Sequence, residues 1–155
     1  MRYIFISLAA VALFASCTSS KVAKTGKNEG TKVEAAVFTE SMLYATPWRI
    51  EKLEVDGKTL EVPKDVEATI VFDQKDSRVH GRCCNSYFGS FTLKGNVLSF
   101  SKMGSTKMLC HGIINDIEMA YHQALSVPQT VAVSGKTLTF KSDKGIITFS
   151  AFNLE

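Results

Sequence analysis

From Trp48 to Ala151 the sequence consists of short apolar runs separated by turn-forming residues, and this pattern constrains the fold more than any other feature. In several runs apolar and polar residues alternate, as they do around Ala68, Ile70 and Phe72. A period of two is that of a half-buried β-strand, and the intervening turn signals are typical of hairpins. The sequence therefore predicts a mainly β domain whose consecutive strands pair as an antiparallel meander.

The first expected strand covers residues 48–55, and its alternation slips between Ile50 and Leu53. Asp56-Gly57 follows, a dipeptide that favours a type I′ turn because both of its positions accept positive φ. A meander of this many short strands would leave its outer edges open to pairing with other chains. Closure into a β-barrel-like sheet removes those edges, so we expect a small barrel.

One segment departs from the strand pattern. Between Asn115 and Pro128 apolar residues recur at intervals of three and four, the period of an amphipathic α-helix. The residues of this stripe are Ile117, Ala120, Tyr121, Ala124 and Leu125. We expect Asn115 to cap the helix and Glu118 to complete a capping box. The predicted fold is thus a small antiparallel β-barrel-like meander with one packed amphipathic α-helix.

The N-terminal residues are typical of an export signal. Met1-Arg2 is a short basic start, and residues 3–15 form an apolar run that is too short to span a bilayer. Phe14-Ala15-Ser16-Cys17 resembles the lipobox at which bacterial lipoproteins are cleaved and acylated. We expect residues 1–16 to be a lipoprotein signal peptide and Cys17 to carry the lipid, because several acyl chains hold a protein stably on a membrane.

Residues 18–39 are mostly polar or small, so we expect 17–45 to be a lipid-anchored linker and 46–155 to be the folded domain. Thr18 takes the place of the aspartate found in inner-membrane retention signals, which resembles an outer-membrane lipoprotein. An exported chain meets no nucleic acid, and no basic patch is interleaved with aromatic residues. The expected partner is the membrane, through the lipid anchor, and the domain is expected to be a monomer.

Three of the four cysteines remain once Cys17 is assigned to the lipid, in a compartment that permits disulfides. Cys84 and Cys110 lie in segments that the strand order can bring together, and a bridge between them would stabilise the fold by about 3 to 4 kcal/mol in the chain-entropy model. Cys83 faces the opposite side of its strand from Cys84. Bridges from Cys83 to Cys110 or to Cys84 remain alternatives.

Two blocks of sequence and one helical glutamate form a pattern together. The positions are Trp48, Phe72, Gly81, Cys84-Asn85-Ser86-Tyr87-Phe88-Gly89-Ser90-Phe91, Thr106-Lys107-Met108-Leu109-Cys110 and Glu118. This pattern resembles the META domain of HslJ-like bacterial lipoproteins over about Pro47 to Phe152, with Cys83 standing where that family usually has glycine. The motif residues that we expect to be structural are Gly81, Asn85, Tyr87, Gly89, Thr106, Met108 and Glu118. The suspected disulfide joins Cys84 to Cys110.

The resemblance implies a small β-barrel-like fold with a packed helix. It also implies residence in the bacterial cell envelope, induction by heat shock and a part in tolerance of certain antibiotics. No catalytic activity or cofactor is associated with the family, so the resemblance implies a domain that works by binding or by protein interaction.

Two chemical alternatives have weaker support. The candidate zinc or copper ligands are His80, Cys83, Cys84, Cys110 and His111. No Cys-x-x-Cys or His-x-x-x-His pair places two of them on one turn, so we predict no metal site. A thiol redox protein needs a cysteine of low pKa, for which Arg82 beside Cys83 is weak support. We predict no catalytic residues and no cofactor.

We therefore predict a non-enzymatic envelope lipoprotein domain that binds an unknown envelope protein. A lipocalin-like carrier of a small apolar ligand is the main alternative. Bulky side chains are expected to fill the barrel, which disfavours a carrier: Phe72, Phe91, Leu93, Phe100, Leu138, Phe140 and Phe149. The aromatic residues Tyr87 and Phe88 are expected in the core as well.

Overall fold

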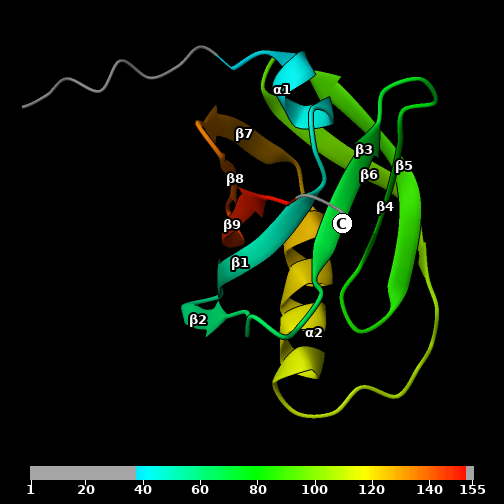
Figure 1. Ribbon diagram of the computed structural model, residues 1–155, viewed down its shortest axis with the longest axis vertical. Coiled ribbons are helices and arrows are strands. Elements are labelled where there is room, and N and C mark those ends of the chain that lie inside the picture. Colours follow the sequence, from blue (N-terminus) through cyan, green and yellow to red (C-terminus); the bar gives the residue numbers. More distant parts are fainter. Residues whose placement is uncertain (1–37, 153–155) are drawn as a thin grey trace, which may run out of the picture. The chain divides into compact units, whose positions relative to one another are not determined.

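The computed structural model describes residues 38–152 (Figure 1). The expected signal peptide, Cys17 and most of the expected linker lie outside these residues. The elements in chain order are α1 Glu40–Tyr44, β1 Trp48–Val55, β2 Lys58–Glu61, β3 Thr69–Asp73, β4 Arg78–Arg82, β5 Ser86–Lys94, β6 Val97–Ser105, α2 Ile113–Leu125, β7 Gln129–Ser134, β8 Thr137–Ser142 and β9 Gly145–Ala151. Neither helix in the described range is long and apolar enough to cross a membrane.

The strands form a closed antiparallel barrel, as the alternating pattern predicts. Eight strands follow one another around the barrel in the order β1, β3, β4, β5, β6, β7, β8, β9, and β9 pairs back onto β1. The ninth, β2, is a short extra strand that pairs with the second half of β1. The described residues belong to one compact unit. The predicted mainly β, barrel-like fold with a packed helix is therefore confirmed.

The first strand shows how local sequence sets the register. In β1 the pairing with β9 shifts between Ile50 and Lys52, where the apolar alternation slips. This bulge lets Ile50 and Leu53 both point into the core, and both are fully buried. At the turn that follows, Asp56 has φ of 49° and Gly57 has φ of 75°, as a type I′ turn requires.

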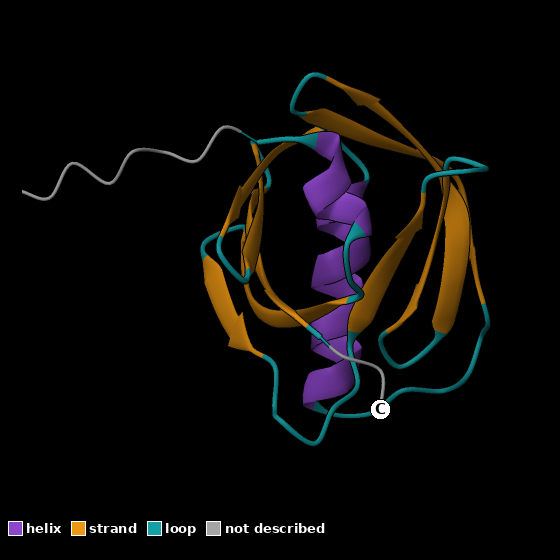
Figure 2. Cartoon of the chain, turned by 45° about the horizontal axis from the view of Figure 1, so that its top comes forward, coloured by secondary structure: helices purple, strands orange, loops and turns teal. Residues whose placement is uncertain are grey.

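Two seams of the barrel are narrow. The pair β1–β3 shares two register positions, and so does the pair β6–β7, whereas β5 and β6 share seven. Strands β3–β6 and strands β7–β9 with β1 are therefore two well-paired halves that meet along short edges. In Figure 2 strands lie on both sides of the helices, and α2 contacts β1 and β9.

The buried face of α2 is the predicted stripe. Ile117, Tyr121, Ala124 and Leu125 are buried, and α2 contacts β1 and β9. The C-terminal end of α2 is fixed to β7 by Gln129, whose fully buried side-chain Nε2 donates hydrogen bonds to the carbonyls of Ala124 at 2.6 Å and Val127 at 2.7 Å. Carbonyls at a helix end lack partners inside the helix, so this buried amide takes the part of a cap.

Aromatic rings fill the interior of the barrel. The ring centroids of Phe140 and Phe149 lie 4.7 Å apart, those of Phe72 and Phe91 5.2 Å apart, and those of Phe72 and Phe140 6.3 Å apart. All four side chains are at most 5 % exposed. Rings at these separations are in contact, so they occupy the space that a carrier would reserve for its ligand.

The folded part begins before Thr46. Helix α1 lies in the stretch expected to be linker, and its Leu43 is fully buried in the core. The carbonyl of Leu43 accepts a hydrogen bond of 3.0 Å from the indole Nε1 of Trp48, which is 2 % exposed. Trp48 is the sole tryptophan of the chain, so its fluorescence reports on the packing of α1 against the barrel.

One core prediction is wrong. Phe88 is 54 % exposed, because Tyr87 and Gly89 on either side of it face inward. The Phe88 ring lies outside the barrel over Gly104, where an added Cβ would come within 3.1 Å of the ring. Adjacent strand residues face opposite sides of a sheet, so Tyr87 and Phe88 cannot both be core residues.

Gly81 is required by the buried tyrosine beside it. The Tyr87 hydroxyl donates a 2.7 Å hydrogen bond to the carbonyl of Thr69 and accepts one of 2.7 Å from the Tyr121 hydroxyl. A Cβ at Gly81 would lie 2.5 Å from the Tyr87 hydroxyl and closer still to the Thr69 carbonyl. Burial raises the pKa of both tyrosines, so both remain neutral hydrogen-bonding groups.

We expect Gly81→Ala to lower the free energy of unfolding by about 2 to 3 kcal/mol, because the added methyl group has no room to enter. Urea unfolding followed by Trp48 fluorescence measures the loss. Gly104→Ala is the matched control, since the exposed Phe88 ring can move away from the new methyl group. Equal stabilities for the two variants would contradict the conclusion that the buried Tyr87 requires glycine at position 81.

Candidate functional site

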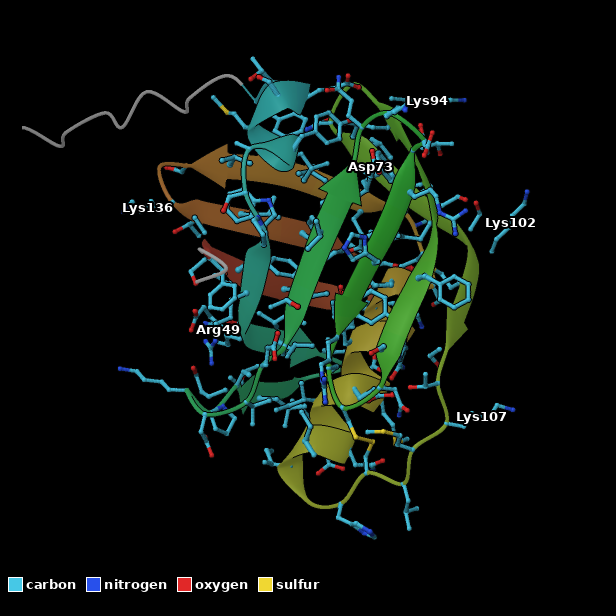
Figure 3. The ribbon with its side chains drawn as sticks, turned by 45° about the vertical axis from the view of Figure 1, so that its right-hand side comes forward. Arg49, Asp73, Lys94, Lys102, Lys107 and Lys136 are labelled. Carbon is cyan, nitrogen blue, oxygen red and sulfur yellow. A yellow bond between two sulfur atoms is a disulfide. The ribbon has the colours of Figure 1, made fainter. Side chains whose placement is uncertain are left out.

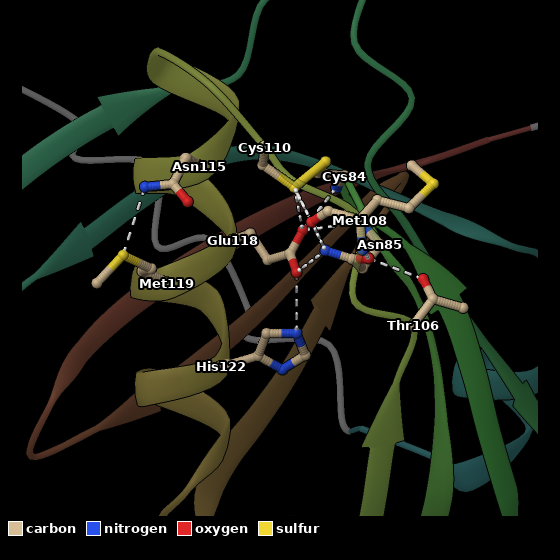
Figure 4. The surroundings of a disulfide bond; sticks show 9 residues. All are labelled: Cys84, Asn85, Thr106, Met108, Cys110, Asn115, Glu118, Met119 and His122. Atoms are coloured by element: carbon tan, nitrogen blue, oxygen red, sulfur yellow. Dashed lines mark hydrogen bonds and ion pairs between the residues drawn. A yellow bond between two sulfur atoms is a disulfide. The ribbon is translucent and has the colours of Figure 1, made fainter.

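A disulfide joins the turn between β4 and β5 to the loop that leads into α2 (Figure 4). Cys84 and Cys110 are the bonded pair, with Cα atoms 6.2 Å apart and a sequence separation of 26. We call residues 106–112 the disulfide loop. The bridge links the β4–β5 turn, in the β3–β6 half of the barrel, to the loop that leads into α2.

Asn85 is the hydrogen-bonding centre of the site. Its side chain is buried, and its Oδ1 accepts hydrogen bonds from the Thr106 hydroxyl at 2.8 Å and from the Met108 backbone N–H at 2.7 Å. Its Nδ2 donates to Glu118 Oε1 at 2.9 Å and lies 3.4 Å from the Met108 carbonyl. An asparagine side chain has two donors and one oxygen acceptor with two lone pairs, so this amide is close to fully used.

The Glu118 carboxylate holds α2 to the turn between β4 and β5. Its Oε2 accepts hydrogen bonds from the backbone N–H groups of Cys84 at 2.9 Å and Asn85 at 2.8 Å, and its Oε1 accepts the bond from the Asn85 amide. The side chain is 12 % exposed. Hydrogen bonds from N–H groups to a carboxylate are about twice as strong as neutral ones, so three of them compensate for the partial burial.

The predicted capping box is therefore wrong. Helix α2 begins at Ile113 with Gly112 before it, at φ of 62°, and no side chain caps its N-terminus. Asn115 lies inside the first turn, where its side-chain amide reaches Met119 Sδ at 3.5 Å. Glu118 cannot turn back to the helix start because its carboxylate is engaged across the site. The glycine accepts the left-handed φ that the chain needs on entering the helix.

His122 lies one turn beyond Glu118, with Nε2 3.9 Å from Glu118 Oε1. The imidazole is one-third exposed and its edge faces the Tyr87 ring, so it is more buried than an exposed helical pair would be. Burial lowers the pKa of His122, and the nearby Glu118 opposes part of that shift. The neutral imidazole is favoured at neutral pH.

Cys83 is a buried free thiol on the inner side of the strand end. Burial, with a smaller effect from Glu118, raises the pKa of Cys83 to about 12. The thiolate is the reactive form of cysteine, so this environment suppresses nucleophilic and redox chemistry. Arg82, beside it in sequence, is exposed on the opposite face and does not offset the effect of burial.

Of the five candidate metal ligands, only Cys84 and Cys110 are seen to lie together, in the disulfide. His80 and His111 are exposed, and Cys83 faces the core. Within residues 38–152 the one group of three potential ligands is Cys84, Cys110 and Glu118, whose ligand atoms lie within 4.8 Å of one another. Cysteine binds metals as thiolate, and the two sulfurs here are joined in a disulfide.

The motif residues divide into those that build the barrel and those that hold the loop. Gly89 is buried beneath Met103, whose Sδ occupies the position that a side chain would need. Thr106 and Met108 act through Asn85, and Met108 does so through its backbone alone, because its side chain is 55 % exposed. The sequence pattern points to the position of Met108 without revealing that its side chain is free.

Sequence reasoning missed the apex of the loop. Leu109 is 83 % exposed, the largest exposed fraction among the large apolar side chains of residues 38–152. Its neighbours are held on both sides, Met108 by Asn85 and Cys110 by the disulfide. The available sequence signal is the apolar pair Met108-Leu109, which stands between Lys107 and Cys110 in a stretch without acidic residues.

These observations define a class of protein: a small closed antiparallel barrel with one packed helix and a disulfide-held loop. The chain belongs to the META domain family, whose model matches residues 41–151. No curated protein matches the chain.

Two solved structures share the fold. An NMR structure of a protein from Burkholderia xenovorans is 27 % identical with a TM-score of 0.61, and the match covers 74 % of this chain and 86 % of that one. A second NMR structure is 22 % identical with a TM-score of 0.61, and the match covers 74 % of this chain and 95 % of that one. The second likeness bears on the fold alone.

We expect Asn85→Ala to lower the free energy of unfolding by about 3 kcal/mol, because several partly buried partners lose their hydrogen bonds together. Asn115→Ala is the matched control and is expected to change stability by less than about 0.5 kcal/mol. Urea unfolding of both variants checks this. A similar loss in the two would show that the Asn85 bonds add little.

The thiols give a separate prediction. The chain beginning at Glu34, kept without reductant, should take up no iodoacetamide at about pH 8. That pH lies about four units below the Cys83 pKa of about 12, so the thiol is protonated, and it is also shielded from solvent. In urea it should take up one label, at Cys83. Peptide mass spectrometry locates the label. Labels at Cys84 or Cys110 would contradict the observed pairing.

Proposed function

We propose that this protein is a non-enzymatic lipoprotein domain of the bacterial cell envelope, anchored through Cys17 in the outer membrane. It contributes to envelope stress or antibiotic tolerance by binding an envelope component through the disulfide loop. The proposal uses no cofactor and no metal.

The observation that carries this proposal is that the polar motif residues hold the backbone of the disulfide loop in place. Asn85 and Glu118 are the best-placed groups for chemistry, and their hydrogen bonds hold backbone groups of the loop and of the turn that faces it. The loop presents Leu109 at 83 % exposure. A rigid loop that exposes an apolar side chain suits binding, because little conformational entropy remains to be lost on contact.

The two other candidate functions lack such support. The aromatic rings at the centre of the barrel are in mutual contact, which disfavours a carrier. The raised pKa of Cys83 disfavours a thiol enzyme, and its burial does the same. Binding by the loop is therefore the function that the geometry supports best.

Complementation in a strain that lacks the gene tests the proposal. Deletion should lower survival under heat or antibiotic challenge, and the wild-type gene should restore it. Cys17→Ala should remove the protein from membranes that have been washed with high salt, because only the lipid anchor resists such a wash. The double variant Met108→Ser, Leu109→Ser should remain on the washed membranes and fail to restore survival.

Met119→Ser is the matched control, because Met119 is also a large exposed apolar side chain, on α2. It should restore survival fully. A deletion strain that survives as well as the wild type would refute the stress role, and rescue by the double loop variant would refute the role of the loop.

A further inference from the structure

Residues 77–115 have an unusual charge pattern. This stretch, which spans β4, β5, β6 and the disulfide loop, contains five lysines and arginines and no aspartate or glutamate. The ion pairs found among residues 38–152 are Arg49–Glu51, Lys52–Glu54 and His122–Glu118, so none of the five cations has a carboxylate partner within the described part of the chain. Their charges are free to face an anionic partner.

The same stretch contains most of the exposed apolar surface. Five of the six large apolar side chains exposed in the described residues belong to it: Phe88, Val97, Met108, Leu109 and Ile113. Unpaired cations and exposed apolar groups therefore come from one continuous segment. Each feature alone is ordinary on a protein surface, and their coincidence calls for an explanation.

Strand register places several of these groups on one outer face. Phe88 pairs with His80 on β4 and with Gly104 on β6. Arg82 is two residues along β4 from His80, so it lies on the same side of the sheet and is exposed. A bulge in β6, with Lys102 at φ of 51°, leaves the lysine side chain exposed near the same row.

The disulfide loop continues this face beyond the end of the sheet. The Thr106 N–H donates a 3.0 Å hydrogen bond to the Ser86 carbonyl, and Ser86 pairs with Arg82. Lys107, Met108 and Leu109 follow directly. We call Arg82, Phe88, Lys102, Lys107, Met108 and Leu109 the basic-apolar face.

The Glu118 carboxylate behind the disulfide loop is engaged by the Cys84 and Asn85 amides, and several other acidic groups lie away from this face. Asp73 and Asp76 are at the turn between β3 and β4, at the opposite end of β4 from Arg82. Asp116 lines a groove of about 260 Å³ between α2 and the β1–β2 hairpin, together with Asp56. Figure 3 shows Lys94, Lys102 and Lys107 along one side of the molecule and Lys136 on the other.

We propose that the basic-apolar face docks on an anionic lipid bilayer. Leu109 and Met108 enter the boundary between headgroups and acyl chains, and Lys107, Lys102 and Arg82 contact the lipid phosphates. Interfacial binding needs this combination, because apolar burial supplies depth and cations supply attraction to anionic headgroups. The disulfide and the Asn85 bonds hold the inserting residues in position before contact.

This inference rests on the proposed function and names the partner of the same loop. The twenty residues between Cys17 and Phe38 can span at most about 66 to 72 Å when extended, and a small domain is about 30 Å across. A lipid anchor at Cys17 therefore leaves the domain free to turn its basic-apolar face to the membrane.

Flotation with vesicles tests the inference. The chain beginning at Glu34 is used, because it keeps the closed barrel with its core and removes Lys21, Lys24, Lys27 and Lys32, which would bind anionic lipid by themselves. It should bind vesicles of phosphatidylcholine mixed with phosphatidylglycerol, and binding to pure phosphatidylcholine should be much weaker. High salt should weaken the binding to the mixed vesicles, because it screens the lysine and arginine charges.

Single variants separate the apolar contribution to vesicle binding from the electrostatic one. Leu109→Ser should lower the partition coefficient by about tenfold, since a leucine side chain no longer leaves water. Lys102→Gln and Lys107→Gln should each lower it by about fivefold. Met119→Ser and Lys136→Gln are the matched controls outside the face and should bind like the wild type.

Trp48 fluorescence and circular dichroism confirm that each variant is folded. No binding to the mixed vesicles would overturn the inference, and so would equal losses from Leu109→Ser and Met119→Ser. Failure of vesicle binding is distinguishable from failure of the proposed function, because survival of the complemented strains is measured separately and needs no particular lipid.

Discussion

The hydrogen bonds from the Cys84 and Asn85 amides to the Glu118 carboxylate are the contact on which the rest of the structure depends. The barrel has two narrow seams, and its halves are joined there by few backbone bonds. Helix α2 packs on β1 and β9 in one half, while Glu118 reaches the turn between β4 and β5 in the other. One carboxylate thus connects a helix that belongs to one half with backbone that belongs to the other. The Tyr87–Tyr121 hydrogen bond makes the same connection inside the core.

The disulfide and Asn85 act on the same connection from the outside. The bridge lowers the conformational entropy of the unfolded chain. In the chain-entropy model, closing a loop of this length stabilises the fold by about 3.5 kcal/mol. Asn85 instead acts on the native state, because its Oδ1 accepts the Met108 N–H and so fixes the residue next to the apex of the loop. A loop of exposed apolar residues would ordinarily sample many conformations, at a cost in entropy when it binds. Here the hydrogen bond at Met108 and the bridge at Cys110 limit that freedom in the folded protein.

Much of the fold could be predicted because it follows from local rules. The alternation of residues 48–55, with its slip, sets the bulge in β1, and the Asp56-Gly57 turn follows from backbone freedom. The wrong capping-box prediction has its origin in contacts between distant residues. Glu118 has the spacing of a capping residue, but its partners lie more than thirty residues away, and no local pattern reveals them. The Phe88 error is different. Successive strand residues face opposite sides of a sheet, so the inward position of Tyr87 was sufficient to predict that Phe88 lies outside the barrel.

Amide hydrogen exchange at Met108 measures how firmly the Asn85 and Glu118 hydrogen bonds hold the disulfide loop. The side chain of Met108 is 55 % exposed and lies in no helix or strand, yet its N–H donates a 2.7 Å hydrogen bond to the buried Asn85. We expect this amide to exchange slowly, together with the amides of Cys84 and Asn85, and we expect Glu118→Ala to accelerate the exchange of all three. Exchange of the Met108 amide at the rate of an unstructured peptide in the wild-type protein would contradict this expectation.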